Sequence, residues 1–275
     1  VERVADSAAA LADRVIVTAK VDACLPNPGA TLAAALGPGP FAVICLFISP
    51  QADLAALLAE NAFAAPVIGC TTAGEIADGY AEGSIVALGL PVENFAADLL
   101  LVPDLAAIDR EFLIGRLIRA RQGLQSARPD WEHEFAFLMV DGLSTREDEL
   151  AAALASGLGP VPLFGGSAAD GTRFRETFVV HGGRALRNAA VLAMIRSRCR
   201  ARVFKLDHLV PTDIRMVVTE ADPASRTVRR INAEPAAREY ARLLGKDPGQ
   251  LDAFTFAAYP VVVRIGGKHH VRAIQ

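Results

Sequence analysis

The sequence lacks any apolar run long enough to cross a membrane. The longest run, FAVICLFI at residues 41–48, lies between Pro40 and Ser49-Pro50, whereas a transmembrane helix needs about 20 apolar residues. The first residues also lack a basic leader followed by an apolar stretch. We therefore expect a cytoplasmic protein without membrane spans, from which an upstream segment is missing because the chain begins at Val1.

The sequence also lacks a surplus of basic residues. The net charge is −3 and the two signs are interspersed, so no basic stripe is available for a phosphate backbone and nucleic acid is excluded as a partner. Only residues 194–205, MIRSRCRARVFK, are locally basic, and they are either a solvated connector or an anionic docking surface. Neither glycine-rich phosphate-binding motif occurs, which disfavours nucleotide binding.

The sequence contains few cysteines, and they are widely spaced. The four residues, Cys24, Cys45, Cys70 and Cys199, form no C-x-x-C pair. This spacing argues against structural zinc and against a disulfide framework, and we expect reduced thiols.

What is present is a series of short apolar segments typical of buried strands. Residues 41–48 predict a strand covered on both faces, because they are apolar without alternation. A helix is predicted to begin at Ser49 and Pro50. Further strands are predicted at 66–70, 84–90 and 95–102, followed by a helix over 107–121.

The same order then starts again, which predicts an internal duplication. The segment that begins at residue 135 is similar to the one that begins at residue 41. At an offset of 96 residues, Pro66 and Gly69 recur as Pro162 and Gly165. We expect half-units at about 30–125 and 126–200 that face each other across a pseudo-twofold axis.

The last third changes character and predicts a second domain. Residues 1–200 are expected to form one domain, and 201–275 a smaller α+β domain that is incomplete at its end. The predicted fold class is α/β to α+β, with mixed sheets flanked by helices.

Cys70 raises the question of catalysis. It ends a predicted strand, so its thiolate could act as a nucleophile with nearby backbone amides as an oxyanion hole and His133 or His181 as base. The corresponding loop carries Gly166 at this position. A small buried residue is therefore the alternative interpretation.

A binding loop is the other interpretation of this segment. Glycines let the backbone approach a ligand, hydroxyls bind polar groups, Glu75 and Asp170 could hold an ammonium, and backbone amides a carboxylate. Tight turns without a ligand are the alternative. The predicted site comprises Gly69, Cys70, Thr71, Thr72, Gly74, Glu75, Gly165, Gly166, Ser167, Asp170, Arg173 and His181.

His181 precedes a glycine turn and could line a cleft or bind a metal or haem iron, or it could be an ordinary turn residue. His269 and His270 alternate across a predicted strand and cannot easily share one metal.

Five stretches resemble FIST domain proteins, an N-terminal part followed by a truncated C-terminal part. They are PVIGCTTAGEI at 66–76, the segments 162–171 and 177–195, RMVVTEADPASRTVRRINAEPAAREYARLLG at 215–245, and YPVVVRIGGKHHVRAI at 259–274. The resemblance implies a small-ligand-binding sensory module of bacterial signal transduction, for ligands such as amino acids. It also implies kinase, cyclase or chemoreceptor output partners. Some members of the family resemble haem-containing nitric-oxide sensors.

Three hypotheses follow. The first is a sensor that closes around a small polar ligand in a cleft between the half-units and the smaller domain. The second is a haem-based nitric-oxide sensor using His181, and the third is a thiol-dependent enzyme using Cys70.

Overall fold

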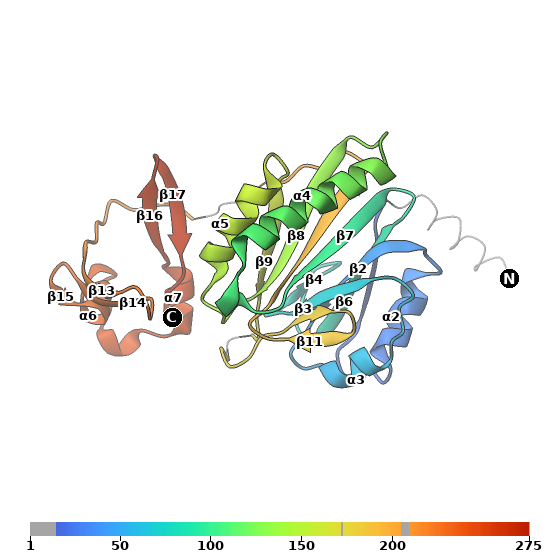
Figure 1. Cartoon of the computed structure of the whole chain (residues 1–275). Coiled ribbons are helices and arrows are strands. Elements are labelled where there is room, and N and C mark those ends of the chain that lie inside the picture. Colours follow the sequence, from blue (N-terminus) through green and yellow to red (C-terminus); the bar gives the residue numbers. More distant parts are fainter. Residues whose placement is uncertain (1–14, 172, 205–208, 275) are drawn as a thin grey trace. The chain divides into compact units, whose positions relative to one another are not determined.

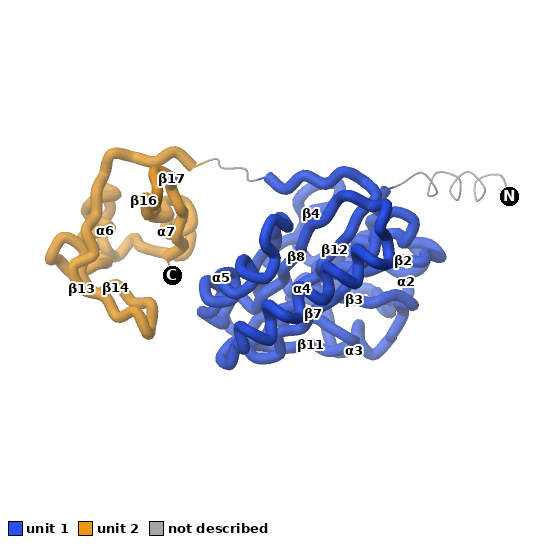
Figure 2. Tube along the Cα trace, turned by 45° about the horizontal axis from the view of Figure 1, so that its top comes forward, with its two compact units in different colours: residues 1–204 blue, residues 205–275 orange. Residues whose placement is uncertain are grey.

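The computed structural model describes residues 15–171, 173–204 and 209–274 (Figure 1). The chain divides into two compact units, residues 1–204 and 205–275 (Figure 2). No helix in the described ranges is long and apolar enough to cross a membrane.

Unit 1 contains two large mixed sheets. The six-stranded sheet has the order β1-β6-β2-β3-β10-β11, with bounds Val17–Asp22, Ser84–Pro91, Phe41–Ile48, Val67–Thr71, Val179–His181 and Arg184–Leu186. The four-stranded sheet has the order β7-β12-β8-β9, with bounds Phe95–Val102, Ala190–Ser197, His133–Asp141 and Leu163–Ala168. A short hairpin joins β4, Glu75–Ile76, to β5, Tyr80–Ala81.

Helices cover the outer face of each sheet, so unit 1 has four layers. α2 (Pro28–Leu36) and α3 (Leu54–Ala59) pack on the six-stranded sheet. α4 (Arg110–Ala127) and α5 (Glu147–Leu158) pack on the four-stranded sheet (Figure 1). A short 3-10 helix, Leu105–Ala107, precedes α4. The predicted class, mixed sheets flanked by helices, is confirmed.

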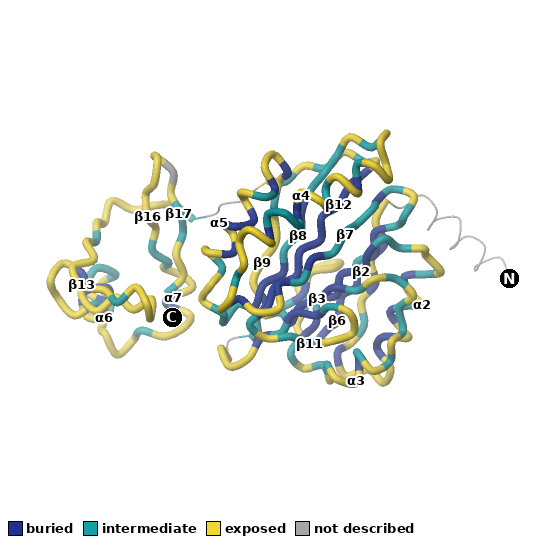
Figure 3. The backbone as a smooth tube through the Cα atoms, in the orientation of Figure 1, coloured by how far each residue is buried: buried dark blue, intermediate teal, exposed yellow. Residues whose placement is uncertain are grey.

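The strand β2 shows why these segments are apolar without alternation. Val43 and Cys45 face the layer between the two sheets, whereas Ile44, Leu46 and Ile48 face the helices. Since successive side chains of a strand point to opposite faces, a strand between two layers must be apolar at every position. Figure 3 shows these central strands as the most deeply buried part of unit 1.

The two sheets repeat one strand order. β1-β6-β2-β3 and β7-β12-β8-β9 each contain one parallel pair, β2 with β3 and β8 with β9, and are otherwise antiparallel. In each parallel pair a proline carbonyl accepts from the neighbouring strand at 2.9 Å, Pro66 from Ile44 and Pro162 from Ala136. The duplication of the sequence itself stays a prediction.

The expected half-unit bounds need correction. We placed residues 95–125 in the first half-unit, but β7 pairs with β12, and α4 packs against β7 and β12 in the four-stranded sheet. Hydrogen bonding and packing therefore group both elements with the second sheet. The order of the predicted strands and helices along the sequence did not reveal which of the two sheets β7 and α4 would join.

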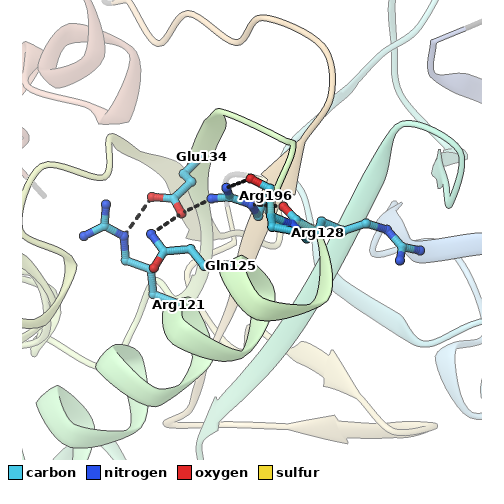
Figure 4. A network of polar contacts seen from close by, with 6 residues as sticks. Arg121, Gln125, Arg128, Glu134 and Arg196 are labelled. Atoms are coloured by element: carbon cyan, nitrogen blue, oxygen red, sulfur yellow. Dashed lines mark hydrogen bonds and ion pairs between the residues drawn. The ribbon is translucent and has the colours of Figure 1, made fainter.

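A charged cluster fixes the end of α4 to the four-stranded sheet (Figure 4). Arg196 on β12 is buried and donates to Glu134 on β8 at 2.6 Å and to the carbonyl of Arg128 at 2.8 Å. Glu134 also accepts from Arg121 and Gln125 of α4. Because each buried charge has partners, the cluster avoids the cost of burying an unpaired ion, which is several kcal/mol.

Unit 2 is built from small sheets and short helices. Its three-stranded sheet has the order β13-β14-β15 and a hairpin pairs β16 with β17. The strand bounds are Val218–Asp222, Thr227–Ile231, Glu234–Pro235, Val261–Ile265 and Lys268–Arg272, and the helices are α6 (Ala236–Leu243), a 3-10 turn (Pro248–Gln250) and α7 (Ala253–Ala258). The hydroxyl of Tyr240 donates to the carbonyl of Tyr259 at 2.6 Å and ties α6 to the end of α7.

Gly165 and Gly166 provide a matched test of backbone packing. A Cβ at Gly165 would lie 2.0 Å from the carbonyl oxygen of Leu138, whereas one at Gly166 would meet nothing within 4 Å. We expect Gly165→Ala to lower the free energy of unfolding by roughly 3 kcal/mol, and Gly166→Ala to change it by less than about 1 kcal/mol. Urea unfolding of both variants measures this. Equal effects would mean that β9 does not lie this close to β8.

Candidate functional site

A pocket of about 320 Å³ in unit 1 gathers polar side chains from loops of both sheets. The segments 49–51 and 72–75 directly follow the carboxyl ends of the parallel strands β2 and β3. Open α/β sheets bind ligands in the crevice at this edge. The lining residues are Ser49, Pro50, Gln51, Thr72, Ala73, Gly74, Glu75, Glu82, Gly83, Asp170, Gly171 and Arg173.

The turn after β2 forms one wall. Ser49 is buried, and its hydroxyl oxygen accepts from the backbone N–H of Gln51 at 3.3 Å. The helix that we expected to begin here starts instead at Leu54, with Asp53 as its N-cap. Residues 49–51 are therefore free to line the pocket.

Gly83, which directly precedes β6, lets the side chain of Gln51 approach its backbone closely. Its φ is +75°, and a Cβ there would lie 2.9 Å from the Gln51 amide oxygen. A side chain at this position would be strained in its backbone and would push the amide of Gln51 away.

Glu75 holds the loop after β3 against the start of β6. It is only 2% exposed, and it accepts from the hydroxyl of Thr72 and from the N–H and hydroxyl of Ser84, at 3.2 and 2.9 Å. Both carboxylate oxygens therefore already have donors. We expected Glu75 to bind a ligand ammonium. Its hydrogen bonds to Thr72 and Ser84 instead hold the loop in place.

Asp170 organises the loop that follows β9. It is 3% exposed and accepts from the backbone N–H groups of Phe174, Arg175 and Glu176 at 2.9, 2.8 and 3.1 Å. Burial alone would raise the pKa of this carboxyl, but the three amide donors and the nearby charge of Arg173 lower it.

Arg173 extends from that loop to the pocket. Its Nε donates to the carbonyl oxygen of Asp170 at 3.0 Å, which fixes the direction of the guanidinium plane. Arg173 is exposed and is the one cation among the described lining residues.

The predicted loops therefore meet only in part. Thr72, Gly74 and Glu75 from one and Asp170 and Arg173 from the other line the same pocket. The remaining predicted residues lie elsewhere in unit 1.

The glycines Gly69 and Gly165 approach neighbouring strands. A Cβ at Gly69 would lie 2.9 Å from the carbonyl oxygen of Leu46, as one at Gly165 would lie against Leu138. Their small size serves strand packing, whereas we expected it to serve ligand approach. Gly166 and Ser167 are exposed on β9 and do not line the pocket.

Thr71 joins the two sheets from within β3. It is buried, its N–H donates to the carbonyl of Phe178 at 3.0 Å, and its hydroxyl oxygen accepts from the N–H of Phe178 at 3.0 Å. Its carbonyl accepts from Ala169 at 2.9 Å. The hydroxyl that we assigned to ligand binding thus holds the loop carrying Asp170.

Cys70 lies in the layer between the two sheets. It is 6% exposed and packs with Cys45 and Val179 among the core residues. Burial raises the pKa of its thiol to about 12, which disfavours the thiolate that a nucleophile requires. These surroundings agree with a small buried residue.

His181 lies away from the pocket. It pairs with Ile68 near the start of β3. Because Ile68 lies three residues before Thr71 along this strand, His181 is roughly 10 Å from the end of β3 that borders the pocket. Burial and the nearby charge of Arg184 lower its pKa. No cluster of His, Cys, Asp and Glu that could hold a metal occurs among residues that the structure describes.

The sequence model of the FIST N domain matches residues 42–234. The chain belongs to the FIST N domain family. This family consists of sensory domains of signal transduction. No curated protein matches the chain.

The FIST N domain match includes all of the pocket and continues into unit 2. It stops at residue 234 and so overlaps residues 201–234 of the FIST C-terminal domain that we expected at 201–275. That C-terminal domain stays a prediction.

Sequence reasoning missed half of the pocket of this FIST domain. Ser49, Pro50 and Gln51 were assigned to a helix, and Ala73, Glu82 and Gly83 were not singled out. A Glu-Gly pair directly before the predicted strand at 84–90 was the available signal for the turn that carries Glu82.

The buried thiols of the FIST domain predict slow alkylation. In a Cys24→Ser/Cys199→Ser variant, we expect Cys45 and Cys70 to react with iodoacetamide at pH 7 only at the rate of unfolding, because both are buried and weakly acidic. Mass spectrometry of tryptic peptides measures the rate, with urea-unfolded protein as the control. Fast native labelling of Cys70 would restore the thiol-enzyme hypothesis.

Asp170 predicts an acid-dependent contribution to stability. Since its folded pKa is lowered, this contribution is complete above the unfolded value of about 3.9 and is lost as the pH falls through the folded pKa. We expect Asp170→Asn to cost roughly 2 kcal/mol at pH 7, and less as the pH falls from 5 to 3. Urea titrations at each pH measure this, with the exposed Asp78→Asn as control. A cost that does not change with pH would contradict the assignment.

Proposed function

We propose that this FIST domain senses a small polar molecule bound in the pocket at the carboxyl ends of β2 and β3. The observation that carries the proposal is that the pocket is composite. Thr72 and Glu75 belong to the six-stranded half of unit 1, whereas Asp170 and Arg173 belong to the segment that leaves the four-stranded sheet. A ligand there contacts two elements far apart in sequence.

The lining chemistry supports binding of a polar metabolite. It offers hydroxyls from Ser49 and Thr72, the amide of Gln51, carboxylates and one guanidinium. The described lining contains no cysteine and no histidine, so it has no thiol nucleophile or imidazole base. We therefore propose a binding role for this pocket and not catalysis.

The signal in this proposal is a shift between conformations of the pocket loops. The β4-β5 hairpin is held through Glu75, and the loop after β9 through Asp170. A ligand that contacts both favours the arrangement in which both are closed, by the difference in its affinity for the two states. The proposed partner is a kinase, cyclase or chemoreceptor that responds to the closed conformation of these loops.

Ala73 and Ala77 provide a matched test of the pocket. Ala73 lines it, whereas Ala77 lies in the turn of the β4-β5 hairpin outside the lining. A metabolite library is screened by thermal unfolding, and native mass spectrometry identifies any molecule that co-purifies. At 100 times its Kd a ligand stabilises by about 2.7 kcal/mol, which is a shift of roughly 5 to 10 °C.

We expect Ala73→Phe to abolish this shift by filling the pocket and Ala77→Phe to preserve it. Melting temperatures without ligand show whether each variant folds. A ligand whose shift survives in folded Ala73→Phe binds elsewhere, and the pocket assignment is then wrong.

A further inference from the structure

Arg173 has guanidinium nitrogens available to a ligand. Its only hydrogen bond to another described residue is from Nε to the carbonyl of Asp170. No ion pair joins it to a carboxylate in the described ranges, although three carboxylates share its pocket. With Nε fixed, the two terminal nitrogens form a planar fork of the kind that binds a carboxylate through two parallel hydrogen bonds.

The neighbouring carboxylates differ in how fully they are used. Glu75 and Asp170 each accept three hydrogen bonds from the protein. Glu82 is exposed and accepts one, from the hydroxyl of Tyr80 at 2.8 Å. Glu82 is therefore the carboxylate with most capacity left for a ligand cation.

The summed charge limits which anions can bind. Three carboxylates and one guanidinium give the described lining a net charge of −2. A doubly charged phosphate would be repelled by this excess, whereas a single carboxylate accompanied by a cationic group would not.

We propose that Arg173 determines specificity by binding the carboxylate of the ligand, while the cationic group of the ligand faces Glu82. This inference rests on the proposed function and adds which residues hold the two charged groups of the ligand, a small molecule with one carboxylate and at least one ammonium or guanidinium group. Arg175 gives the matched control, because it is an exposed arginine of the same loop that does not line the pocket.

The test uses thermal unfolding and calorimetric titration of the whole chain. The probes are the twenty standard L-amino acids, β-alanine, 4-aminobutyrate and the diamine putrescine. The best-binding amino carboxylate is then compared with its carboxamide, which lacks the anion, and with its hydroxy analogue, which lacks the cation. The protein variants are Arg173→Ala, Arg173→Lys, Arg175→Ala and Glu82→Gln.

We expect the carboxamide and Arg173→Ala each to weaken binding roughly 10- to 100-fold. Arg173→Lys keeps the charge but loses the fork, and should rescue only part of the affinity. Glu82→Gln should weaken the amino carboxylate more than the hydroxy analogue. Arg175→Ala should stay within about twofold of wild type, as expected for a site without a direct contact.

Undiminished binding to Arg173→Ala, or putrescine binding as tightly as the amino carboxylate, overturns the inference. If no probe binds but another metabolite gives a shift that Ala73→Phe abolishes, the inference fails and the proposed function stands. If no molecule gives such a shift, the proposed function itself fails.

Discussion

The pocket depends on the hydrogen bonds of one buried residue, Thr71. Its backbone and hydroxyl hold Phe178 and Ala169, at the two ends of the segment that leaves the four-stranded sheet and crosses to the six-stranded one. Asp170 and Arg173 follow Ala169 in this segment and line the pocket at the ends of β2 and β3. The N–H, the carbonyl and the hydroxyl oxygen of Thr71 all have partners within the protein. Thr71 therefore positions the site, and the neighbouring residues line the pocket.

The same strand order occurs in both sheets, but in the described residues different groups occupy the ends of their parallel strands. At the end of β8, Asp141 is buried and accepts from the hydroxyl of Thr177 and from backbone amides of Leu143 and Asn188. A Cβ on the adjacent Gly142 would lie 2.3 Å from a backbone carbonyl. The position that Ser49 occupies at the end of β2, where it lines the pocket, is thus occupied at the end of β8 by a carboxylate with partners in the protein and by tight backbone packing.

The sequence predicts the central strands well, because a strand between two layers is apolar at every position and few other structures require that. It identifies Gly69 and Gly165 as points of close approach, but the approaching group is the carbonyl of a neighbouring strand. Which group approaches each glycine depends on the tertiary structure and cannot be predicted from the local sequence. Ser49 and Gln51 were missed because Ser-Pro is also a good helix start, and Glu82 because its role depends on which loops fold beside it.

Glu75 and Asp170 link ligand binding to loop position in the proposed sensor. Each carboxylate both lines the pocket and holds one of its loops through hydrogen bonds to a charged group, and such bonds are worth about 1.5 to 3 kcal/mol each. Reversing a 1:99 equilibrium needs about 5.5 kcal/mol of differential affinity. Two or three bonds of this kind, strengthened or weakened together, have that magnitude. In the proposed sensor, a small molecule that contacts residues of both loops can therefore supply enough energy to move them, as a ligand spanning the composite pocket would.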